Sequence, residues 1–488
     1  MVIAKNLAVK QVSNISSTVY GCRRFSMNNI TSALQNTLKP VFEIHGNIEL
    51  IIAYSGGIDS QVLLHALTQL KQNKLISNEI TVCHVNHGLS DNAECWQKLA
   101  EQECTKLSVK LVVKRVNVQV KAQQSLEALA RDARYYALKT LRDNKSIVLT
   151  GHHSDDQSET FLLALKRGAG LKGLSAMSVQ TPLGQHLLVR PLLNVSRQAI
   201  EDYAKTHQLS WVEDESNLDT SFDRNFIRQQ IIPLLRERWP SINNTINRSA
   251  SHCLAGQELL DELAEQDLTV CKNGETGLHI HALTALSPAR FNNLLRFFMA
   301  QQGCLMPSTE QVNQVRQQLQ ADEDKNPQIK VAQHVFRRFK GTLFLTPEYN
   351  DISDWQGQVD LFQETTPLGN SVLTLPDNLG ELVFNTNTVT SSNQNTDDNN
   401  ALPRISLPKQ GQQVSVRFCH ENPKCLPHFR LHSRAVKKVL QELNIAPWQR
   451  KRIAFLYYDN ELVAAIGHFI CKPFIACDKQ VSMHISLH

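Results

Sequence analysis

The pattern of apolar and polar residues divides the chain into regions of different character. Between residues 41 and 239, four short apolar runs, at 50–54, 80–85, 111–116 and 147–150, alternate with amphipathic stretches such as 61–70 and 125–141. Buried strands that alternate with helices are typical of a parallel sheet covered on both faces. The sequence therefore predicts an α/β domain with a parallel sheet over 41–239.

The remaining chain predicts smaller domains. Residues 240–349 show helical periodicity, as at 254–268, 288–299 and 309–319, and predict a mainly helical domain. Residues 350–403 are polar and rich in Asn, Thr, Gly and Asp, which predicts a linker region. From 404 to 488 the pattern is that of a small, basic α+β domain.

The first forty residues carry five Lys or Arg side chains and no acidic one. This composition faintly resembles an organellar presequence. We favour a simpler interpretation, in which residues 1–40 are a disordered extension or the start of the chain is Met27.

Composition narrows the class of protein. No apolar run reaches the roughly 20 residues of a membrane-spanning helix, so we expect no membrane partner. Eleven scattered cysteines suggest reduced thiols and a cytoplasmic protein. Cys419 and Cys425, like Cys471 and Cys477, are spaced more widely than the ligands of structural zinc, so no zinc is expected. The formal net charge of +5 is too small to establish nucleic-acid binding by itself.

A phosphate-binding motif follows the first apolar run. The residues are Ser55, Gly56, Gly57, Ile58, Asp59 and Ser60. Two glycines let the backbone approach an anion, and the first N–H groups of the following helix point toward that anion. The Asp59 carboxylate beside a phosphate is best explained as a Mg²⁺ ligand. The chain has no Walker A sequence, so this phosphate-binding motif is not a Walker-type P-loop.

Two further polar clusters follow apolar runs. Asp156 and Glu159 stand three residues apart in the segment 151–160, on one face of a predicted helix, and they could hold a cationic amine or merely form a solvated acidic face. The segment 214–228 contains Arg224 and Arg228, which could bind phosphate or carboxylate, or form surface ion pairs.

The basic segment 417–452 predicts an RNA-binding surface. It contains nine Lys or Arg residues and only two acids. With Ser433 as the N-cap, a helix would bury Val436 and Val439 and leave Lys437 and Lys438 facing outward, close to Arg434. Such a face suits an RNA backbone, although a solvated surface would look the same.

Taken together, these motifs resemble the tRNA(Ile)-lysidine synthases, a family of N-type ATP pyrophosphatases with a PP-loop. The resemblance runs from about residue 48 onward and rests on SGGIDS at 55–60, HVNHGLS at 84–90, TGHHSDDQSETFLL at 150–163, RPLL at 190–193, DESNLDTSFDRNFIR at 214–228 and KKVLQELNIAPWQR at 437–450. The residues 431–434 depart from the family pattern, because many relatives have glycines there.

The resemblance implies an activity and its partners. ATP would adenylate the wobble cytidine of the tRNA(Ile) with a CAU anticodon, and free L-lysine would then displace AMP. Residues Ser55 to Ser60 would hold pyrophosphate with Mg²⁺ on Asp59, while Asp156, Glu159 and Arg224 would recognise lysine. The helical and C-terminal domains would bind tRNA. The roles of His152 and of Arg228 relative to Arg224 stay open, as does a homodimer.

The closest alternative is a tRNA thiolase on the same fold. Sulfur-inserting relatives commonly need paired cysteines, whereas this chain has no CxxC sequence and no cysteine in the segments 55–60 or 152–157. An amidotransferase-type synthetase would need a glutaminase domain, which is not apparent. A non-catalytic RNA-binding protein is disfavoured by the intact SGGxDS and DDxxE motifs.

Overall fold

The computed structural model describes residues 30–90, 92–117, 126–319, 328–361, 371–387, 402–477 and 482–487. The chain divides into two compact units, residues 1–262 and 263–488. Each unit is described by itself below. Within the described residues, no helix combines the length and the apolar character that a bilayer crossing requires.

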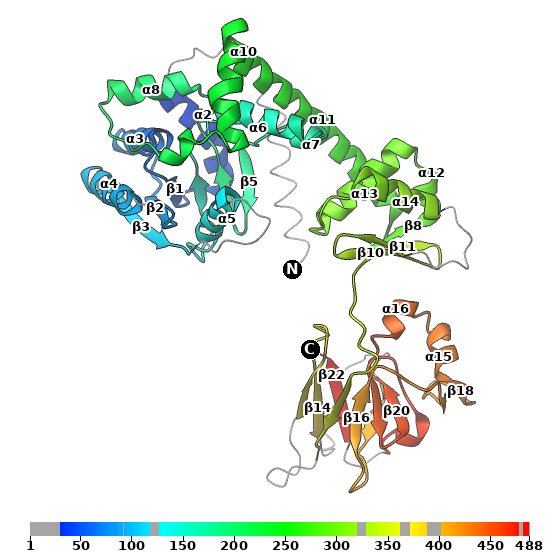
Figure 1. Cartoon of the computed structure of the whole chain (residues 1–488). Coiled ribbons are helices and arrows are strands. Elements are labelled where there is room, and N and C mark those ends of the chain that lie inside the picture. Colours follow the sequence, from blue (N-terminus) through cyan, green and yellow to red (C-terminus); the bar gives the residue numbers. More distant parts are fainter. Residues whose placement is uncertain are drawn as a thin grey trace. The chain divides into compact units, whose positions relative to one another are not determined.

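Unit 1 is built on a six-stranded sheet in the order β3-β2-β1-β4-β6-β5 (Figure 1). The strands are β1 Leu50–Tyr54, β2 Ile80–Asn86, β3 Lys110–Arg115, β4 Ile147–Leu149, β5 Gln180–Leu183 and β6 His186–Val189. All neighbours pair in parallel except β5 and β6, which form an antiparallel edge. The predicted parallel α/β domain is confirmed, although β5 and β6 were not predicted.

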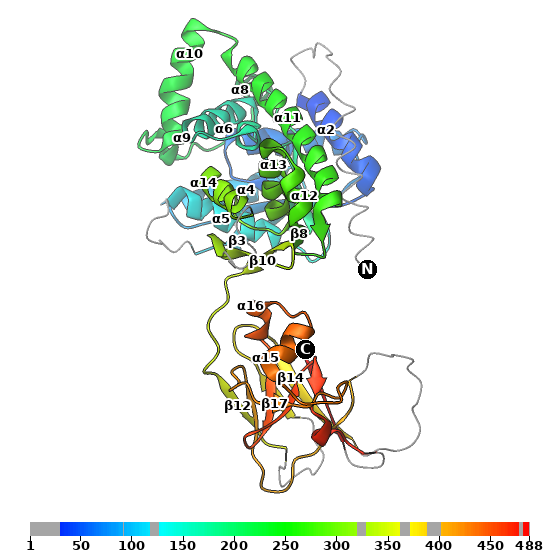
Figure 2. The same ribbon diagram turned by 90° about the vertical axis from the view of Figure 1, so that its right-hand side faces the viewer.

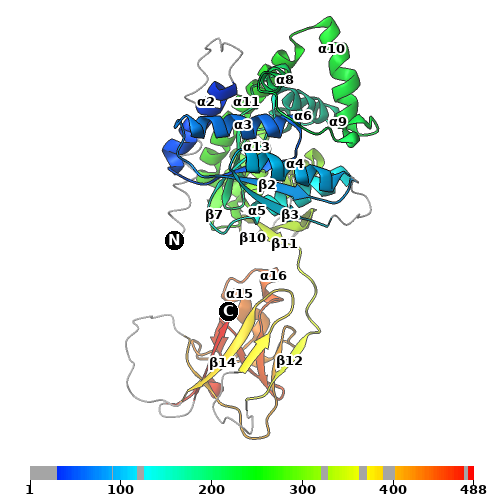
Figure 3. The same ribbon diagram turned by 90° about the vertical axis from the view of Figure 1, so that its left-hand side faces the viewer.

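Helices cover both faces of this sheet (Figure 3). They are α2 Ile30–His45, α3 Ile58–Gln72, α4 Ala93–Lys106, α5 Leu126–Lys139, α6 Ser154–Lys166, α7 Leu171–Leu174 and α8 Arg197–Thr206. Successive strand residues point to opposite faces. Ile52 accordingly joins the apolar cluster formed with α2, α3 and α8, whereas Ile51 joins a smaller cluster with Leu138 of α5.

The first helix corrects the expected N-terminal boundary. Ile30, Leu34 and Leu38 of α2 are buried against the sheet domain. The prediction of a disordered extension up to residue 40 is therefore wrong from Ile30 onward, and residues 1–29 lie outside the described residues. The apolar spacing of four residues is helical, but Pro40 inside the helix obscured it.

Unit 1 ends in a chain of helices, several of them short. These are a 3-10 turn Glu215–Leu218, α9 Asp223–Phe226, a π-helix Ile227–Ile231, α10 Ile232–Arg238 and α11 Ile242–Cys271, which continues into unit 2. A π-helical turn is uncommon and is frequently found at functional sites.

The first part of unit 2 packs helices on a sheet. The helices are α12 Ile280–Ala285, α13 Pro288–Gln301 and α14 Thr309–Leu319; the strands are β7 Lys272–Asn273, β8 Gly277–His279, β9 Gln328–Val331, β10 His334–Phe339 and β11 Thr342–Pro347. The predicted helices are present, and a single apolar cluster joins them to the sheet. The mainly helical prediction was incomplete, because it did not include this five-stranded antiparallel sheet.

The C-terminal part of unit 2 contains two larger sheets and a hairpin (Figure 2). The strands are β12 Gln356–Val359, β13 Ser371–Thr374, β14 Glu381–Asn387, β15 Ile405–Ser406, β16 Val414–Arg417, β17 Lys424–Cys425, β18 Arg434–Ala435, β19 Phe455–Tyr458, β20 Glu461–Ala465, β21 Phe469–Ile470 and β22 Ser482–Leu487, with helices α15 Val436–Glu442 and α16 Pro447–Arg450 and the 3-10 turn Lys472–Phe474. β12, β13 and β14 pair within these sheets, so the prediction of a linker over 350–403 is wrong for these strands.

Candidate active site

The phosphate-binding motif forms the tight turn between β1 and α3. Gly56 has φ +88°, a conformation that side chains other than glycine rarely adopt. Ser55 and Ser60 brace the turn: their hydroxyl oxygens lie 3.2 Å apart, and Ser60 donates to the Gly57 carbonyl at 2.9 Å. The turn thus leaves the start of the 15-residue helix α3 facing the cavity, an arrangement suited to an anion.

A second loop approaches this turn closely. A Cβ atom on Gly151 would lie 2.9 Å from the backbone carbonyl carbon of Asp59, so only glycine fits between the β4–α6 connection and α3. The connection leads into His153, the N-cap of α6, whose Nδ1 accepts a hydrogen bond from the Asp155 backbone N–H. His153 therefore caps this helix.

Asp59 lies between a guanidinium group and an imidazole ring. Arg197, at the start of α8, donates from Nη1 to both carboxylate oxygens of Asp59, at 2.9 and 3.1 Å. The His153 Nε2 lies 3.6 Å from the same carboxylate. Burial raises the pKa of Asp59, and the charges of His153 and Arg197 oppose this rise. The Arg197 contact was not predicted, since 138 residues separate the partners and no local pattern links them.

The acidic pair on α6 meets both candidate arginines. Arg224 donates from Nε to Glu159 at 2.8 Å and from Nη2 to Asp156 at 3.1 Å. Arg228 donates from Nε to Glu159 at 2.6 Å and from Nη2 to Asp156 at 3.2 Å. The structure therefore brings together all four of these residues, and a solvated acidic face is ruled out because Glu159 is only 1% exposed.

The ion-pair cluster fixes the charge of its members. Burial alone would raise the pKa of Asp156, but the nearby His153 and Arg224 outweigh it and hold this pKa well below its usual range. Burial would lower the pKa values of Arg224 and Arg228, but Asp156 and Glu159 raise them overall. The cluster thus places two guanidinium groups opposite the carboxylates of Asp156 and Glu159 in a partly buried site.

The remaining residues that the sequence analysis named lie either at the active-site cavity or on the surface. Asp214 lines the cavity, whereas Asp223 forms an exposed ion pair with Lys166. Within α15, Val436 and Val439 are buried and Lys437 and Lys438 are exposed, as predicted. Arg434 is also exposed and lies 3.4 Å from Glu442.

The N-terminus of α15 differs from the prediction. Its N-cap residue is Ala435, not Ser433, since Arg434 and Ala435 pair as β18 with β17. The helix is capped from a distance instead, because the Lys437 backbone N–H donates to the Asn422 side chain at 2.9 Å.

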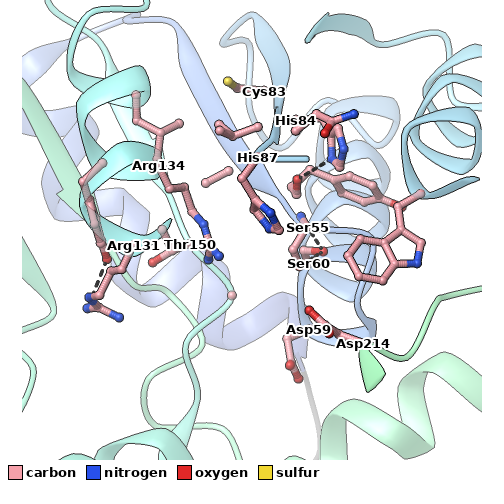
Figure 4. Close-up of a pocket in the computed structure, with 18 of the residues that line it drawn as sticks. Ser55, Asp59, Ser60, Cys83, His84, His87, Arg131, Arg134, Thr150 and Asp214 are labelled. Carbon is pink, nitrogen blue, oxygen red and sulfur yellow. Dashed lines mark hydrogen bonds between the residues drawn. The ribbon is translucent and has the colours of Figure 1, made fainter. Parts of the chain in front are cut away.

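A cavity of about 240 Å³ in unit 1 is lined by residues of the phosphate-binding turn and by Asp156 of the ion-pair cluster. Figure 4 shows Arg131 and Arg134 of α5 across the cavity from Ser55 and Ser60, with His87 between them. Basic side chains opposite a phosphate-binding turn suit a polyphosphate and a nucleotide together. Sequence reasoning did not single out Arg131 or Arg134, because a basic helix face usually only faces solvent.

His152 also lines the cavity, and its environment limits its chemistry. Burial lowers the pKa of His152 to about 3, and Thr150 Oγ1 lies 2.8 Å from its Nδ1. His152 is therefore neutral near pH 7 and can donate or accept a hydrogen bond without carrying charge. A group with so low a pKa is a poor acceptor for the proton of an amine.

One carboxylate beside the phosphate-binding turn is compatible with Mg²⁺. This ion is usually held by one or two carboxylates together with substrate phosphates. Asp59 is such a carboxylate, and its partner Arg197 shows that the position already attracts positive charge. Among the described residues, no group of three or more His, Cys, Asp or Glu side chains could bind a metal without such a substrate.

The strand–turn–helix motif and the cavity at the carboxyl ends of β1, β2 and β4 define a PP-loop ATP-binding domain, and the PP-loop domain family matches residues 27–235. Residues 278–344 match the TilS substrate binding domain, and residues 414–487 match the TilS substrate C-terminal domain. The chain belongs to the tRNA(Ile)-lysidine synthase family and is an enzyme of that family.

Curated relatives agree over most of the chain. The tRNA(Ile)-lysidine synthase of Edwardsiella ictaluri is 43% identical over 88% of this chain and 92% of its own length. Those of Serratia proteamaculans and Pectobacterium atrosepticum are 43% and 40% identical, over 87% and 89% of this chain and 92% and 94% of their own lengths. These relatives support the synthase and give no support to the alternative of a tRNA thiolase.

Proposed function

We propose that the protein ligates free L-lysine to C2 of the wobble cytidine, C34, of the tRNA(Ile) with a CAU anticodon. The observation that carries this proposal is the closeness of two sites in unit 1: the phosphate-binding turn at Ser55–Ser60, and the cluster of Asp156, Glu159, Arg224 and Arg228, of which Asp156 lines the same cavity as the turn. One site suits ATP, and the other suits an amino acid that carries both a carboxylate and amines. The lysidine product would be read with AUA codons.

The chemistry requires two steps. The cytidine O2 attacks the α-phosphorus of ATP, and pyrophosphate leaves; the amine of lysine then attacks C2, AMP leaves, and one proton is released. Cytosine C2 has no leaving group until its oxygen is adenylated, which explains why ATP is needed. The turn at Ser55–Ser60 and the start of α3 would hold the pyrophosphate by backbone N–H groups.

Mg²⁺ on Asp59 would supply positive charge that neutralises the phosphates. The contribution of the chain itself is to hold the Asp59 carboxylate near the turn. Its neighbours His153 and Arg197 keep it there.

Lysine binding must involve an exchange of partners. Glu159 is 1% exposed and accepts hydrogen bonds from both arginines, so an ammonium group can reach it only if an arginine moves. Arg228 is the better candidate to move, because its side chain is 38% exposed against 20% for Arg224. We propose that lysine replaces Arg228 at Glu159, while Arg224 stays and orients the bound amino acid.

The C-terminal surface of Lys437, Lys438 and Arg434 would hold the tRNA backbone. We place the reaction in the cytoplasm, as the scattered cysteines of the sequence suggest. A homodimer, which the sequence leaves open, would carry two such active sites.

The test uses purified protein, ATP and two transcripts of tRNA(Ile), one with a CAU anticodon and one with GAU. Pyrophosphate release should require the CAU transcript, and labelled lysine should enter that transcript alone. Lysine incorporation into neither transcript would overturn the proposal. Sulfur incorporation in the presence of a sulfur donor would favour the thiolase instead.

A further inference from the structure

A second cavity, of about 380 Å³, lies within unit 2 and has no part in the active site described above. Its walls come from β9 and β10, from the segment 349–352 that follows β11, and from α16 with the two residues after it. Its volume falls in the range of roughly 300–1,000 Å³ that is usual for small-ligand sites. The cavity is thus large enough for one nucleotide.

Aromatic rings and cations alternate in the wall of this cavity. The guanidinium carbon of Arg337 lies 5.5 Å from the ring centre of Tyr349 and 5.8 Å from that of Trp448. On the same Tyr349 ring, the guanidinium carbon of Arg452 lies at 4.3 Å. Both rings therefore have a cation over their face, which is the arrangement of a cation–π contact.

The wall is held in place by contacts outside the cavity. Arg337, which is buried, donates to Thr346 Oγ1 at 2.9 Å, and Arg452 donates to Asp377 at 2.6 Å. Trp448 meets Phe344 edge to face, with ring centres 5.7 Å apart. A rigid aromatic wall of this kind loses little conformational freedom when a ligand binds.

The charge of the lining selects the class of ligand. It contains four cationic side chains, of Arg337, Arg338, Lys451 and Arg452, and one carboxylate, of Asp351. Cations alone would suit any anion, but the combination with Tyr349 and Trp448 suits a phosphate attached to a flat aromatic group. Unpaired nucleotides have this chemistry, because their bases stack on aromatic side chains and their phosphates bind basic ones.

We propose that this cavity binds one unpaired nucleotide of the tRNA substrate at a place other than the wobble position. The base lies against Trp448 and Tyr349, and the phosphate lies near Arg338 and Lys451. The proposal rests on the proposed function only in taking RNA as the substrate. Base-paired RNA does not fit, since its bases are stacked and cannot reach an aromatic wall.

The test measures binding of a fluorescein-labelled single-stranded RNA hexamer to the full chain by anisotropy, without ATP or lysine. Trp448→Ala should weaken this binding by about 5- to 150-fold, the usual effect of losing one base–aromatic stack. Trp448→Phe, which keeps a ring, should restore most of the affinity. A blunt-ended RNA duplex should bind equally to the wild type and to both variants.

A second variant tests the same cavity independently of any local folding effect of Trp448→Ala. Lys451 is exposed, so Lys451→Ala should leave the melting temperature unchanged. It should lower the salt dependence of hexamer binding, log K against log salt, by about 0.7, the value for one phosphate contact on a single strand. Lys409→Ala, an exposed lysine outside the cavity, is the matched control and should not change it.

The proposal is overturned if both Trp448→Ala and Lys451→Ala bind the hexamer like the wild type. It is also overturned if polyglutamate displaces the hexamer as well as unlabelled RNA does, since the cavity would then bind acidic peptides. Because this assay contains neither ATP nor lysine, failure of the proposed ligation would leave its result unchanged. The two proposals can therefore fail separately.

Discussion

Replacing Glu159 with glutamine is the sharpest test of the lysine pocket. The substitution keeps the shape of the side chain but removes its charge. Glu159 accepts from Arg224 at 2.8 Å and from Arg228 at 2.6 and 3.0 Å. A glutamine has one acceptor oxygen, so its amide N–H groups would face one of the arginines donor to donor. Bound lysine, which replaces Arg228 at this side chain, then loses its charge-assisted hydrogen bond to the carboxylate.

The contacts of Glu159 set the expected size of the change in the apparent KM for lysine. A hydrogen bond to a charged group contributes about 1.5–3 kcal/mol, so the apparent KM for lysine should rise by about 10- to 150-fold. Arginine and ornithine should remain poor substitutes for lysine, because both length and charge position matter. Adenylation of tRNA should persist, because the phosphate-binding turn at Ser55–Ser60 does not contact Glu159.

Two assays on one protein separate these effects. The first follows tRNA-dependent pyrophosphate release without lysine, and the second follows lysine incorporation over a concentration series. Glu94→Gln is the matched control, since Glu94 pairs with Arg115 on the surface, with 63% and 67% of the side chains exposed. Such surface pairs contribute about 0–1 kcal/mol, so this variant should behave as wild type.

The result that would refute the assignment is specific. If Glu159→Gln blocks pyrophosphate release but leaves the lysine dependence unchanged, the acidic pair serves ATP rather than lysine. The melting temperature must be measured alongside, because breaking a buried ion pair can cost about 3–5 kcal/mol of stability. Arg228→Ala gives an independent test: because Arg228 must leave Glu159 before lysine can bind there, its loss should lower the lysine KM.

Other outcomes follow from the same site and surfaces. Asp59→Asn should lower pyrophosphate release by about 100-fold or more, because a bound metal contributes several kcal/mol to the transition state; near-normal release would disprove the assignment of this turn. A chain that starts at Met27 keeps all of α2 and should complement a strain lacking the activity as well as the full chain does. Lys437→Ala with Lys438→Ala should reduce the slope of log K against log salt for tRNA by roughly 1.5, with Lys409→Ala as control, and an unchanged slope would place the tRNA elsewhere. Elemental analysis of purified protein should find no stoichiometric zinc, and chelators should leave its circular dichroism unchanged.

Features defined by nearby residues could be predicted from the sequence. The turn at Ser55–Ser60 depends on two glycines and on the strand and helix beside them, all within 23 residues of one another. The pairing of Asp156 with Glu159 depends on helical spacing alone. These are local patterns, and the structure retains them.

Features that depend on topology could not be predicted. Arg197 reaches Asp59 because α8 and α3 pack side by side, and no pattern in the sequence predicts that contact. β13 was missed because its burial alternates, so its exposed residues, such as Val372 at 55%, make the segment read as a loop. Ser433 was predicted as the cap of α15, but the Lys437 backbone N–H is bound by Asn422, 15 positions earlier in the chain.

The segment 223–231 shows how local backbone geometry and selectivity are connected. Arg224 of α9 and Arg228 of the π-helix Ile227–Ile231 are four residues apart, and both reach the face of α6 that carries Asp156 and Glu159. Glu159 is buried, and its charge is tolerated there because two guanidinium groups balance it. A ligand that displaces one arginine must therefore supply a positive charge of its own. The side chain of lysine does so and that of a neutral amino acid does not, so under the proposed mechanism the ion-pair cluster itself selects a cationic amino acid.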